Sequence, residues 1–328
     1  MRKLEYWRTL ATMVGLLILA VGLSACGGGS GGGQSGGSSG GSSQLTIQGS
    51  STVLPISQAA AEAFKQENSD VELTVGGGGT GDGFEAFCGQ TAEIADASRP
   101  IKDEEAQNCQ ENGIDYIELP IALDALAVVV NPQNGFAQDI TLEELKTLWE
   151  PSAVGEITNW NQVRSSWPDQ TIDLYGPGTQ SGTFDYFTEK VVGKTGESRS
   201  DYQASEDDNV LVQGVAGDPN ALGYFGLSYF EQNQQRLKDL PVNDIAPSTE
   251  TAQSGEYPLS RPLFIYVSTQ ALEDNPAVEE FVSFYLDNIN QFVQQAQYVV
   301  LPDQALQKSR ERWENRTAGS DPKEIIAS

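Results

Sequence analysis

The sequence contains no histidine, and only three of its 328 residues are cysteines. Without histidine, a serine hydrolase or phosphatase would lack the usual base that activates its nucleophile. The remaining thiols are too few to build an ordinary zinc site. We therefore expect a protein that holds no metal, needs no cofactor and is not an enzyme.

Basic residues are also scarce, since 19 Lys and Arg stand against 46 Asp and Glu and give a formal charge of −27 at pH 7. Nucleic acids and anionic membrane surfaces are bound through basic patches, so the charge argues against both as partners. Surface charges are largely screened beyond a Debye length of about 8 Å at physiological salt. Local hydrogen-bond donors could therefore still bind a small anion.

The sequence has no apolar run of comfortable membrane-spanning length at its start. Arg2, Lys3 and Arg8 precede an apolar stretch at residues 13–22, which is shorter than the ~20 residues of a membrane span. A basic start followed by a short apolar stretch is typical of a secretory signal peptide. We predict that residues 1–25 are such an export signal.

The residues that follow the signal point to membrane attachment. Leu23–Cys26 (LSAC) resembles the bacterial lipobox, in which the cysteine becomes the lipidated first residue of the mature protein. The alternative is an ordinary signal peptide with an incidental cysteine. Residues 26–44 consist almost entirely of Gly and Ser, a composition typical of a flexible tether. We expect a lipoprotein anchored through Cys26, in the periplasm or at the cell surface.

The two other cysteines, Cys88 and Cys109, would be exported with the rest of the chain. Exported compartments are oxidising, so we predict a disulfide between them. On the chain-entropy argument, a loop of about 20 residues would stabilise the fold by roughly 3 kcal/mol. Two free buried thiols are the alternative.

Short apolar strands alternate with amphipathic helices through the rest of the chain, which is typical of α/β layers with parallel sheets. The length of the chain favours two domains over one. The apolar runs 125–130 (ALAVVV) and 263–268 (LFIYVS) are candidates for strands that cross between the domains. The expected division is lobe 1 at 45–123 and 262–316, lobe 2 at 124–261, and a disordered tail at 317–328.

Three separate segments combine glycines with hydroxyl side chains directly before a predicted helix. These are Gly49–Val53 (GSSTV), Gly79–Gly83 (GTGDG) and Gly176–Thr183 (GPGTQSGT). The first N–H groups of a helix have no partner within the helix and carry a positive partial charge, so helix starts bind anions. Three such segments predict one composite site for a tetrahedral oxyanion, in a cleft that could close around its ligand.

With these segments, the chain from Leu45 to Trp313 resembles the phosphate-binding lipoprotein of the bacterial phosphate-specific ABC transporter, and within that family its cyanobacterial branch. Further matching stretches are Ile94–Pro100, Ser205–Asn209 and Ala221–Gly226. The resemblance implies the type II periplasmic-binding-protein fold, with two α/β lobes and a ligand cleft between them. It also implies high-affinity binding of inorganic phosphate and delivery to a membrane permease. We expect a monomer.

The resemblance also implies which residues contact phosphate. Carried over to this sequence they are Thr52, the Val53 amide, Thr80, Ser98, Ser181, Gly182 and Thr183, to which the loop neighbours Ser51 and Gly81 are added. Two positions depart from the family pattern, because Ser98 stands where an aspartate is common and Pro177 where an arginine is common. Arg99 could supply the missing guanidinium. The ordinary alternative for Arg99 is a surface salt bridge.

A carboxylate that accepts the proton of phosphate would discriminate against sulfate, because sulfate has no proton to donate. The candidates are Asp82, Asp96 and Asp124. Asp124 is favoured because it precedes the predicted crossing strand and should face the cleft. Two alternatives remain: a receptor of the same fold for sulfate or molybdate, and a phosphate sensor or scavenger that is not coupled to transport.

Overall fold

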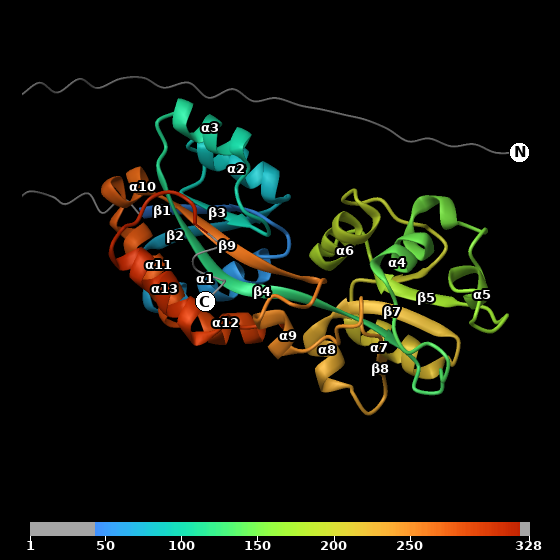
Figure 1. Cartoon of the computed structure of the whole chain (residues 1–328). Coiled ribbons are helices and arrows are strands. Elements are labelled where there is room, and N and C mark those ends of the chain that lie inside the picture. Colours follow the sequence, from blue (N-terminus) through green and yellow to red (C-terminus); the bar gives the residue numbers. More distant parts are fainter. Residues whose placement is uncertain (1–42, 322–328) are drawn as a thin grey trace, which may run out of the picture. The chain divides into compact units, whose positions relative to one another are not determined.

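A nine-stranded mixed sheet runs through residues 43–321, the part of the chain that the computed structural model describes (Figure 1). The strand order is β2-β1-β3-β9-β4-β7-β5-β6, and β8 pairs with β4. The strands are β1 (Ser43–Gly49), β2 (Val71–Gly77), β3 (Ile94–Ala97), β4 (Tyr116–Val130), β5 (Asp173–Pro177), β6 (Gln203–Ser205), β7 (Ala221–Gly226), β8 (Lys238–Asp239) and β9 (Ser260–Ser268). The predicted signal peptide and the lipidation site at Cys26 lie outside the described residues.

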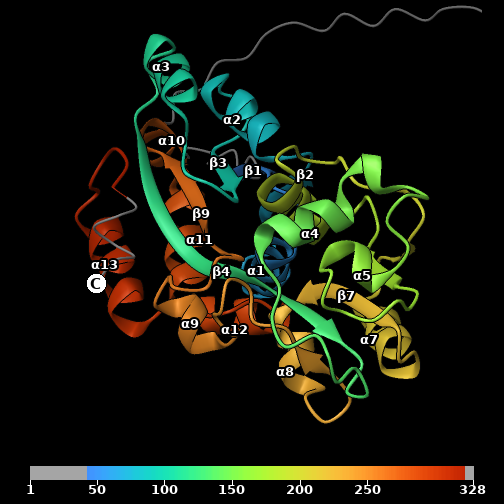
Figure 2. The ribbon, with the colours of Figure 1, turned by 45° about the vertical axis from the view of Figure 1, so that its right-hand side comes forward.

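Helices cover the sheet along its whole length (Figures 1 and 2). They are α1 (Leu54–Glu67), α2 (Thr80–Cys88), α3 (Asp103–Glu111), α4 (Leu142–Trp149), η1 (Pro151–Ala153), α5 (Trp160–Val163), α6 (Gly182–Phe187), the π-helix η2 (Thr188–Val192), α7 (Asp208–Gly217), α8 (Leu227–Gln232), α9 (Thr249–Gln253), α10 (Thr269–Asp274), α11 (Pro276–Asp287), α12 (Ile289–Gln295) and α13 (Asp303–Glu314). Among these helices of residues 43–321, none is both long enough and apolar enough to cross a membrane.

The longest strand, β4, connects the two parts of the sheet (Figure 2). Its first part pairs with β9 in antiparallel register, and its second part pairs with β7 and β8. Around this centre, β1 pairs in parallel with β2 and β3, and β5 pairs in parallel with β6 and β7. The two runs predicted to cross between domains therefore lie in neighbouring strands, while the exact lobe boundaries at 124 and 262 remain predictions.

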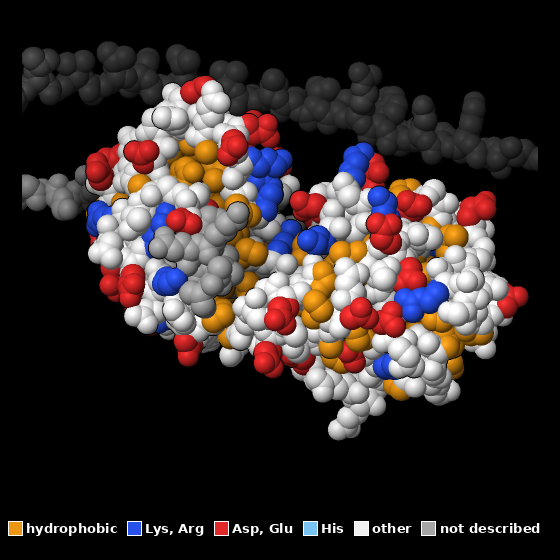
Figure 3. Space-filling model, viewed as in Figure 1, with side chains coloured by type: hydrophobic (Ala, Val, Ile, Leu, Met, Phe, Trp, Pro, Cys, Tyr) orange, Lys and Arg blue, Asp and Glu red, His pale blue; other side chains and the backbone are white. Residues whose placement is uncertain are grey.

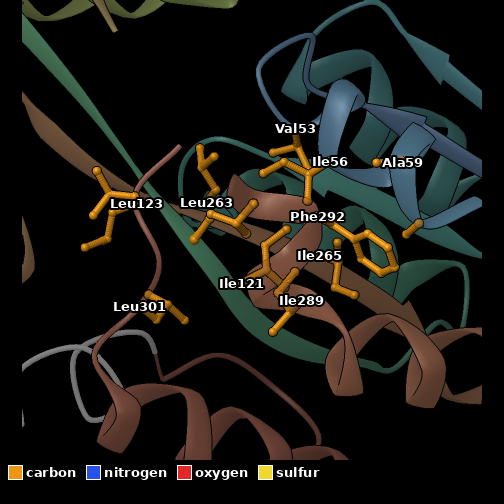
Figure 4. Close-up of a cluster of buried hydrophobic side chains, with 14 of the residues drawn as sticks. Val53, Ile56, Ala59, Ile121, Leu123, Leu263, Ile265, Ile289, Phe292 and Leu301 are labelled. Carbon is orange, nitrogen blue, oxygen red and sulfur yellow. The ribbon is translucent and has the colours of Figure 1, made fainter. Parts of the chain in front are cut away.

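One hydrophobic core joins α1 to the centre of the sheet. Pro55 occupies the first turn of α1, and Ile56, Ala60 and Phe64 are buried on one face at helical spacing. Figure 4 shows Val53 and Ile56 close to side chains of β9 and α12. Burying a large apolar side chain stabilises a fold by roughly 1.5–3 kcal/mol. This packing fixes the position of the 49–53 loop, which begins α1.

Aromatic side chains hold the end of α6 in the other part of the sheet. Thr141 caps α4 by accepting a hydrogen bond from Glu144 N, and the helix ends at the fully buried Trp149. The Trp149 ring lies 4.8 Å from Tyr224, and Phe187 stacks on Tyr224 at 3.6 Å. The last turn of α6 is thus held against β7.

Cys88 and Cys109 form a disulfide, as predicted, and not two free thiols. The bond joins the last residue of α2 to α3. Because α2 begins at Thr80, the disulfide braces one of the predicted ligand segments from its far end.

Residues 317–321 lie at the start of the predicted disordered tail. Gly319 N donates to Tyr116 O at 2.8 Å, and Gly319 pairs with Ile117 in parallel register. Ser320 Oγ lies 3.4 Å from the Tyr116 hydroxyl. This part of the tail therefore contacts β4, and residues 322–328 lie outside the described residues.

Candidate functional site

All three predicted anion segments join the end of a strand to the start of a helix. The 49–53 segment joins β1 to α1, the 79–83 segment follows β2 and enters α2, and the third segment joins β5 to α6. In the first two connections, Gly49, Gly78 and Gly79 adopt positive-φ backbone conformations that other residues rarely adopt. The strand–turn–helix order that the sequence predicted is therefore present.

The first two segments line one polar cavity of about 350 Å³. The predicted residues in its wall are Ser51, Thr52, Thr80, Gly81, Asp82, Ser98 and Arg99; the other lining residues are Ser50, Gly78, Gly79, Lys102, Asp185, Glu189, Thr195 and Arg261. Asp185 and Glu189 belong to α6 and η2, so both parts of the sheet contribute to the cavity. Figure 3 shows Lys and Arg side chains gathered at the hollow between these parts.

The third segment reaches the first through Gly182. A Cβ atom added to Gly182 would lie 2.7 Å from Thr52 Cα and 2.8 Å from Thr52 N, so only glycine permits this contact. Ser181 caps α6 by accepting a hydrogen bond from Thr183 N at 3.2 Å. A second cavity, of about 510 Å³, borders residues 181–183 and shares Ser51 with the first.

Thr80 and Ser98 form a hydroxyl pair in the wall of the first cavity. Their Oγ atoms are 3.1 Å apart, and Ser98 N donates to Thr80 Oγ1 at 3.1 Å. Hydroxyl groups can both donate and accept hydrogen bonds, and they rotate to suit the partner. The pair is therefore suited to bind an oxyanion.

The predicted guanidinium, Arg99, lines the cavity but already has an anionic partner. Its Nη1 and Nη2 donate to the two carboxylate oxygens of Glu105 at 2.8 and 2.7 Å. The guanidinium also lies 5.7 Å from the centre of the Phe84 ring. This geometry matches the ordinary alternative, a salt bridge, better than the predicted role in the ligand site.

Sequence reasoning missed Arg261, which places a guanidinium among the predicted ligand residues. Arg261 Nη2 donates to Thr52 Oγ1 at 3.1 Å, and its Nε donates to Asp124 Oδ2 at 3.3 Å. The guanidinium lies 4.0 Å from the centre of the Tyr186 ring, and only 12% of the side chain is exposed. No local sequence pattern signals this role, because Arg261 reaches the site through the β4–β9 register, which places it opposite Asp124.

The three candidate carboxylates have different surroundings. Asp124 is 1% exposed and bound to Arg261, and burial raises its pKa although Arg261 opposes the shift. Asp82 lies in the cavity wall. Asp96 is fully buried and accepts a hydrogen bond from Ser57 Oγ at 2.9 Å, so its carboxyl lies in the core beneath the site.

Two further carboxylates enter the cavity from α6 and η2, and sequence reasoning missed both. Ser51 Oγ donates to Asp185 Oδ2 at 3.4 Å, and burial raises the pKa of Asp185. Glu189 Oε2 lies 3.7 Å from Arg261 Nη1. No group of three or more metal-ligating side chains occurs among the described residues. The site thus combines helix starts, hydroxyls, one buried guanidinium and several carboxylates.

Helix starts and hydroxyls that line a polar cavity between two parts of an α/β sheet are features of the solute-binding proteins. Comparison with known proteins gives the same class. A PBP superfamily domain, PBP-like 2, matches residues 34–288.

Individual relatives indicate which solute-binding proteins this chain is similar to. Protein SphX of Synechocystis sp. is 47% identical over 298 residues, which cover 89% of this chain and 86% of that protein. The phosphate-binding protein PstS of Staphylococcus saprophyticus is 37% identical over 307 residues, 92% of this chain and 91% of that protein. The crystal structure of a possible phosphate binding protein from Planctomyces limnophilus has a TM-score of 0.80 and 43% identity, covering 84% of this chain and 99% of that chain.

The chain belongs to the PBP superfamily and, within it, to the family that contains SphX and PstS. The family resemblance and the periplasmic-binding-protein fold predicted from the sequence are confirmed. This is a family of binding proteins and not of enzymes.

Proposed function

We propose that the protein binds inorganic phosphate with high affinity through residues 50–53, 80–81, 98 and 181–183, and that it delivers phosphate to an ABC-type permease. The observation that carries the proposal is the contact of Gly182 with Thr52, with Arg261 bound to the same threonine. It supports a site in which amides from two helix starts and one guanidinium surround a single anion. The relatives named PstS are phosphate-binding proteins by name, which supports the same ligand.

The charges of the site suit a divalent oxyanion. Each helix start contributes roughly half a positive charge, and α6 continues without a break into η2, which lengthens that helix to Val192. Arg261 adds one full charge close to Thr52. These positive charges favour a dianion without a metal ion, and the carboxylates of Asp124, Asp185 and Glu189 oppose them. In a site from which water is excluded, these interactions are much stronger than in water.

Asp124 is our proposed acceptor for the proton of phosphate. It is buried and bound to the same guanidinium that reaches Thr52, so a phosphate held by Arg261 would lie close to this carboxylate. Asp185 is the second candidate because it lies in the cavity wall beside Ser51. A fully ionised oxyanion such as sulfate would meet only repulsion from either group.

Calorimetric titrations of the purified protein with phosphate, sulfate and molybdate test the ligand. We expect phosphate to bind at least about 100-fold more tightly than sulfate, because a single unsatisfied charged acceptor costs more than about 1–3 kcal/mol. If sulfate or molybdate binds more tightly than phosphate, the proposed ligand is wrong and the protein is a receptor for that oxyanion.

We also propose that the protein is exported, lipidated at Cys26 and held at the membrane as a monomer. The lipobox-like LSAC sequence and the Gly/Ser composition of residues 27–43 support this proposal. Labelling of cells with radioactive palmitate should mark the wild-type protein and not the Cys26→Ala variant. Phosphate uptake by starved cells that lack the protein separates a transport receptor from a sensor, since unchanged uptake would favour the sensor.

A further inference from the structure

A buried hydrogen-bonded network lies beneath the first ligand segment. Asp96, on β3, is 0% exposed, and its Oδ1 accepts a hydrogen bond from Ser57 Oγ at 2.9 Å. The Ser57 hydroxyl in turn lies 3.1 Å from the hydroxyl of Tyr285, which is also fully buried. The second carboxyl oxygen, Oδ2, is buried and has no hydrogen-bond partner within residues 43–321. Asp96 was a candidate acceptor for the phosphate proton, but its carboxyl is buried in the core, and the proposed ligand roles use none of these groups.

The backbone of Asp96 supports the 49–53 segment directly. Ser50 N donates to Asp96 O at 2.9 Å, and Gly49 pairs with Asp96 in the parallel β1–β3 ladder. A Cβ atom added to Gly49 would lie 3.0 Å from Asp96 N, so the two backbones are in close contact. The Asp96 backbone therefore holds the segment that contains Ser50 and Thr52, which line the cavity. The Asp96 carboxyl contacts Ser57 of α1, the helix that follows this segment.

Among the described residues, the direct hydrogen-bond and strand partners of Asp96 include no cation that would balance a negative charge. Ser57 faces it from α1 and Tyr285 from α11, while Gly49 of β1 and Ile265 of β9 are its partners in the sheet. Of these four, only Tyr285 titrates, and burial raises its pKa well above the ordinary value. Burial also raises the pKa of Asp96 to about 8, although the Ser57 hydrogen bond opposes the shift. The carboxyl is therefore mostly uncharged at neutral pH.

We propose that Asp96 is a positioning residue whose uncharged carboxyl holds α1 through Ser57, directly after the Gly49–Val53 segment, and that its ionisation weakens phosphate binding. The inference rests on the proposed phosphate function. An ionised Asp96 would place a negative charge beneath amides that bind a dianion, and the two charges would repel each other across a poorly solvated core. Affinity should fall as the pH rises through about 8.

The test compares phosphate affinity at about pH 6.5 and about pH 9.5 in the wild type and in Asp96→Asn, by calorimetry. We expect the wild-type affinity to fall about tenfold over this range, which corresponds to a pKa shift of about one unit between free and bound protein. Asp96→Asn has no charge to gain, so its affinities at about pH 6.5 and about pH 9.5 should differ less than about threefold. Every other titrating group is common to both proteins, so parallel pH profiles would overturn the inference.

A second variant keeps the inference testable if Asp96→Asn does not fold. The Ser57 hydroxyl lowers the pKa of Asp96, so Ser57→Ala should move the midpoint of the alkaline loss of affinity to higher pH. An unchanged midpoint contradicts the role of Asp96. A wild-type protein that binds no phosphate at about pH 6.5 contradicts the proposed function itself, whereas pH-independent binding contradicts only the inference on Asp96.

Discussion

Arg261 holds its guanidinium between the hydroxyl of Thr52 and the carboxylate of Asp124. We predict that Arg261→Lys weakens phosphate binding about tenfold to 100-fold, because a hydrogen bond to a charged group is worth about 1.5–3 kcal/mol and lysine lacks the fork geometry. Calorimetry measures the loss, and circular dichroism checks that the variant folds.

Arg99→Lys is the matched control for this prediction. Both Nη atoms of Arg99 already donate to Glu105, so its substitution should change the affinity less than about threefold. A larger loss in Arg99→Lys than in Arg261→Lys would return the ligand role to Arg99, as the sequence first predicted.

These two arginines show which part of the site the sequence could predict. The predicted ligand segments are local motifs, since glycines, hydroxyls and a helix start lie within a few residues of one another, and the strand–turn–helix order predicted there is present. Arg261 is 137 residues from Asp124, and the two meet only because β4 and β9 pair in one particular register. No local pattern reveals that register. Arg99 was favoured only because it follows a predicted ligand residue.

At the scale of elements, the contact between the turn before α6 and the turn before α1 depends on one glycine. In Gly182→Ala the added methyl group would clash with the backbone of Thr52, which cannot move as a flexible side chain could. We predict a loss of phosphate affinity of at least about tenfold, measured by calorimetry, because the two turns could no longer approach each other.

Gly217→Ala serves as the control for this substitution. Gly217 ends α7, and an added Cβ there would meet no atom within 4 Å. Its phosphate affinity should equal that of the wild type. If Gly182→Ala binds phosphate as tightly as Gly217→Ala, the contact of the two turns has no part in the site.

The disulfide acts on α2 and α3 together. We predict that the double variant Cys88→Ser, Cys109→Ser loses about 3 kcal/mol in the free energy of unfolding, because the unfolded chain regains the entropy of a loop of 21 residues. Urea unfolding of the oxidised wild type and the variant measures the difference. A reduced wild type that is as stable as the oxidised protein would contradict the prediction.

At the scale of the whole molecule, the alternation of strands and helices predicted the α/β class, but not the arrangement of the sheet. Parallel pairs occur on both sides of its centre, as the pattern indicated. The centre itself is antiparallel because β9 returns beside β4, and β4 continues from one part of the sheet into the other. Both strands are apolar through most of their length. Such a run predicts that a strand is buried, and it does not predict whether the strand pairs in parallel or antiparallel.

Buried carboxyls make the stability of the whole molecule depend on pH. Burial raises the pKa of Asp96 to about 8 and that of Asp208 to about 6, whereas both groups have a pKa of ~3.9 in the unfolded chain. Between these values the folded state binds more protons than the unfolded state. The free energy of unfolding should therefore fall as the pH rises from about 5 to about 8.

The lowered pKa of Asp201 makes the free energy of unfolding rise with pH, but at pH values below the range of about 5 to about 8. The hydrogen bonds from Arg199 lower the pKa of Asp201 to about 2, so its contribution to stability is complete above the unfolded pKa and is lost only as the pH falls towards about 2.

Urea unfolding of the wild type at about pH 5 and about pH 8 tests the predicted fall in the free energy of unfolding. The fall should be smaller in Asp96→Asn, because its side chain binds no proton. If the free energy of unfolding falls equally in both proteins, Asp96 ionises at the same pH in the folded and unfolded chains. Its burial would then not disfavour the charged form.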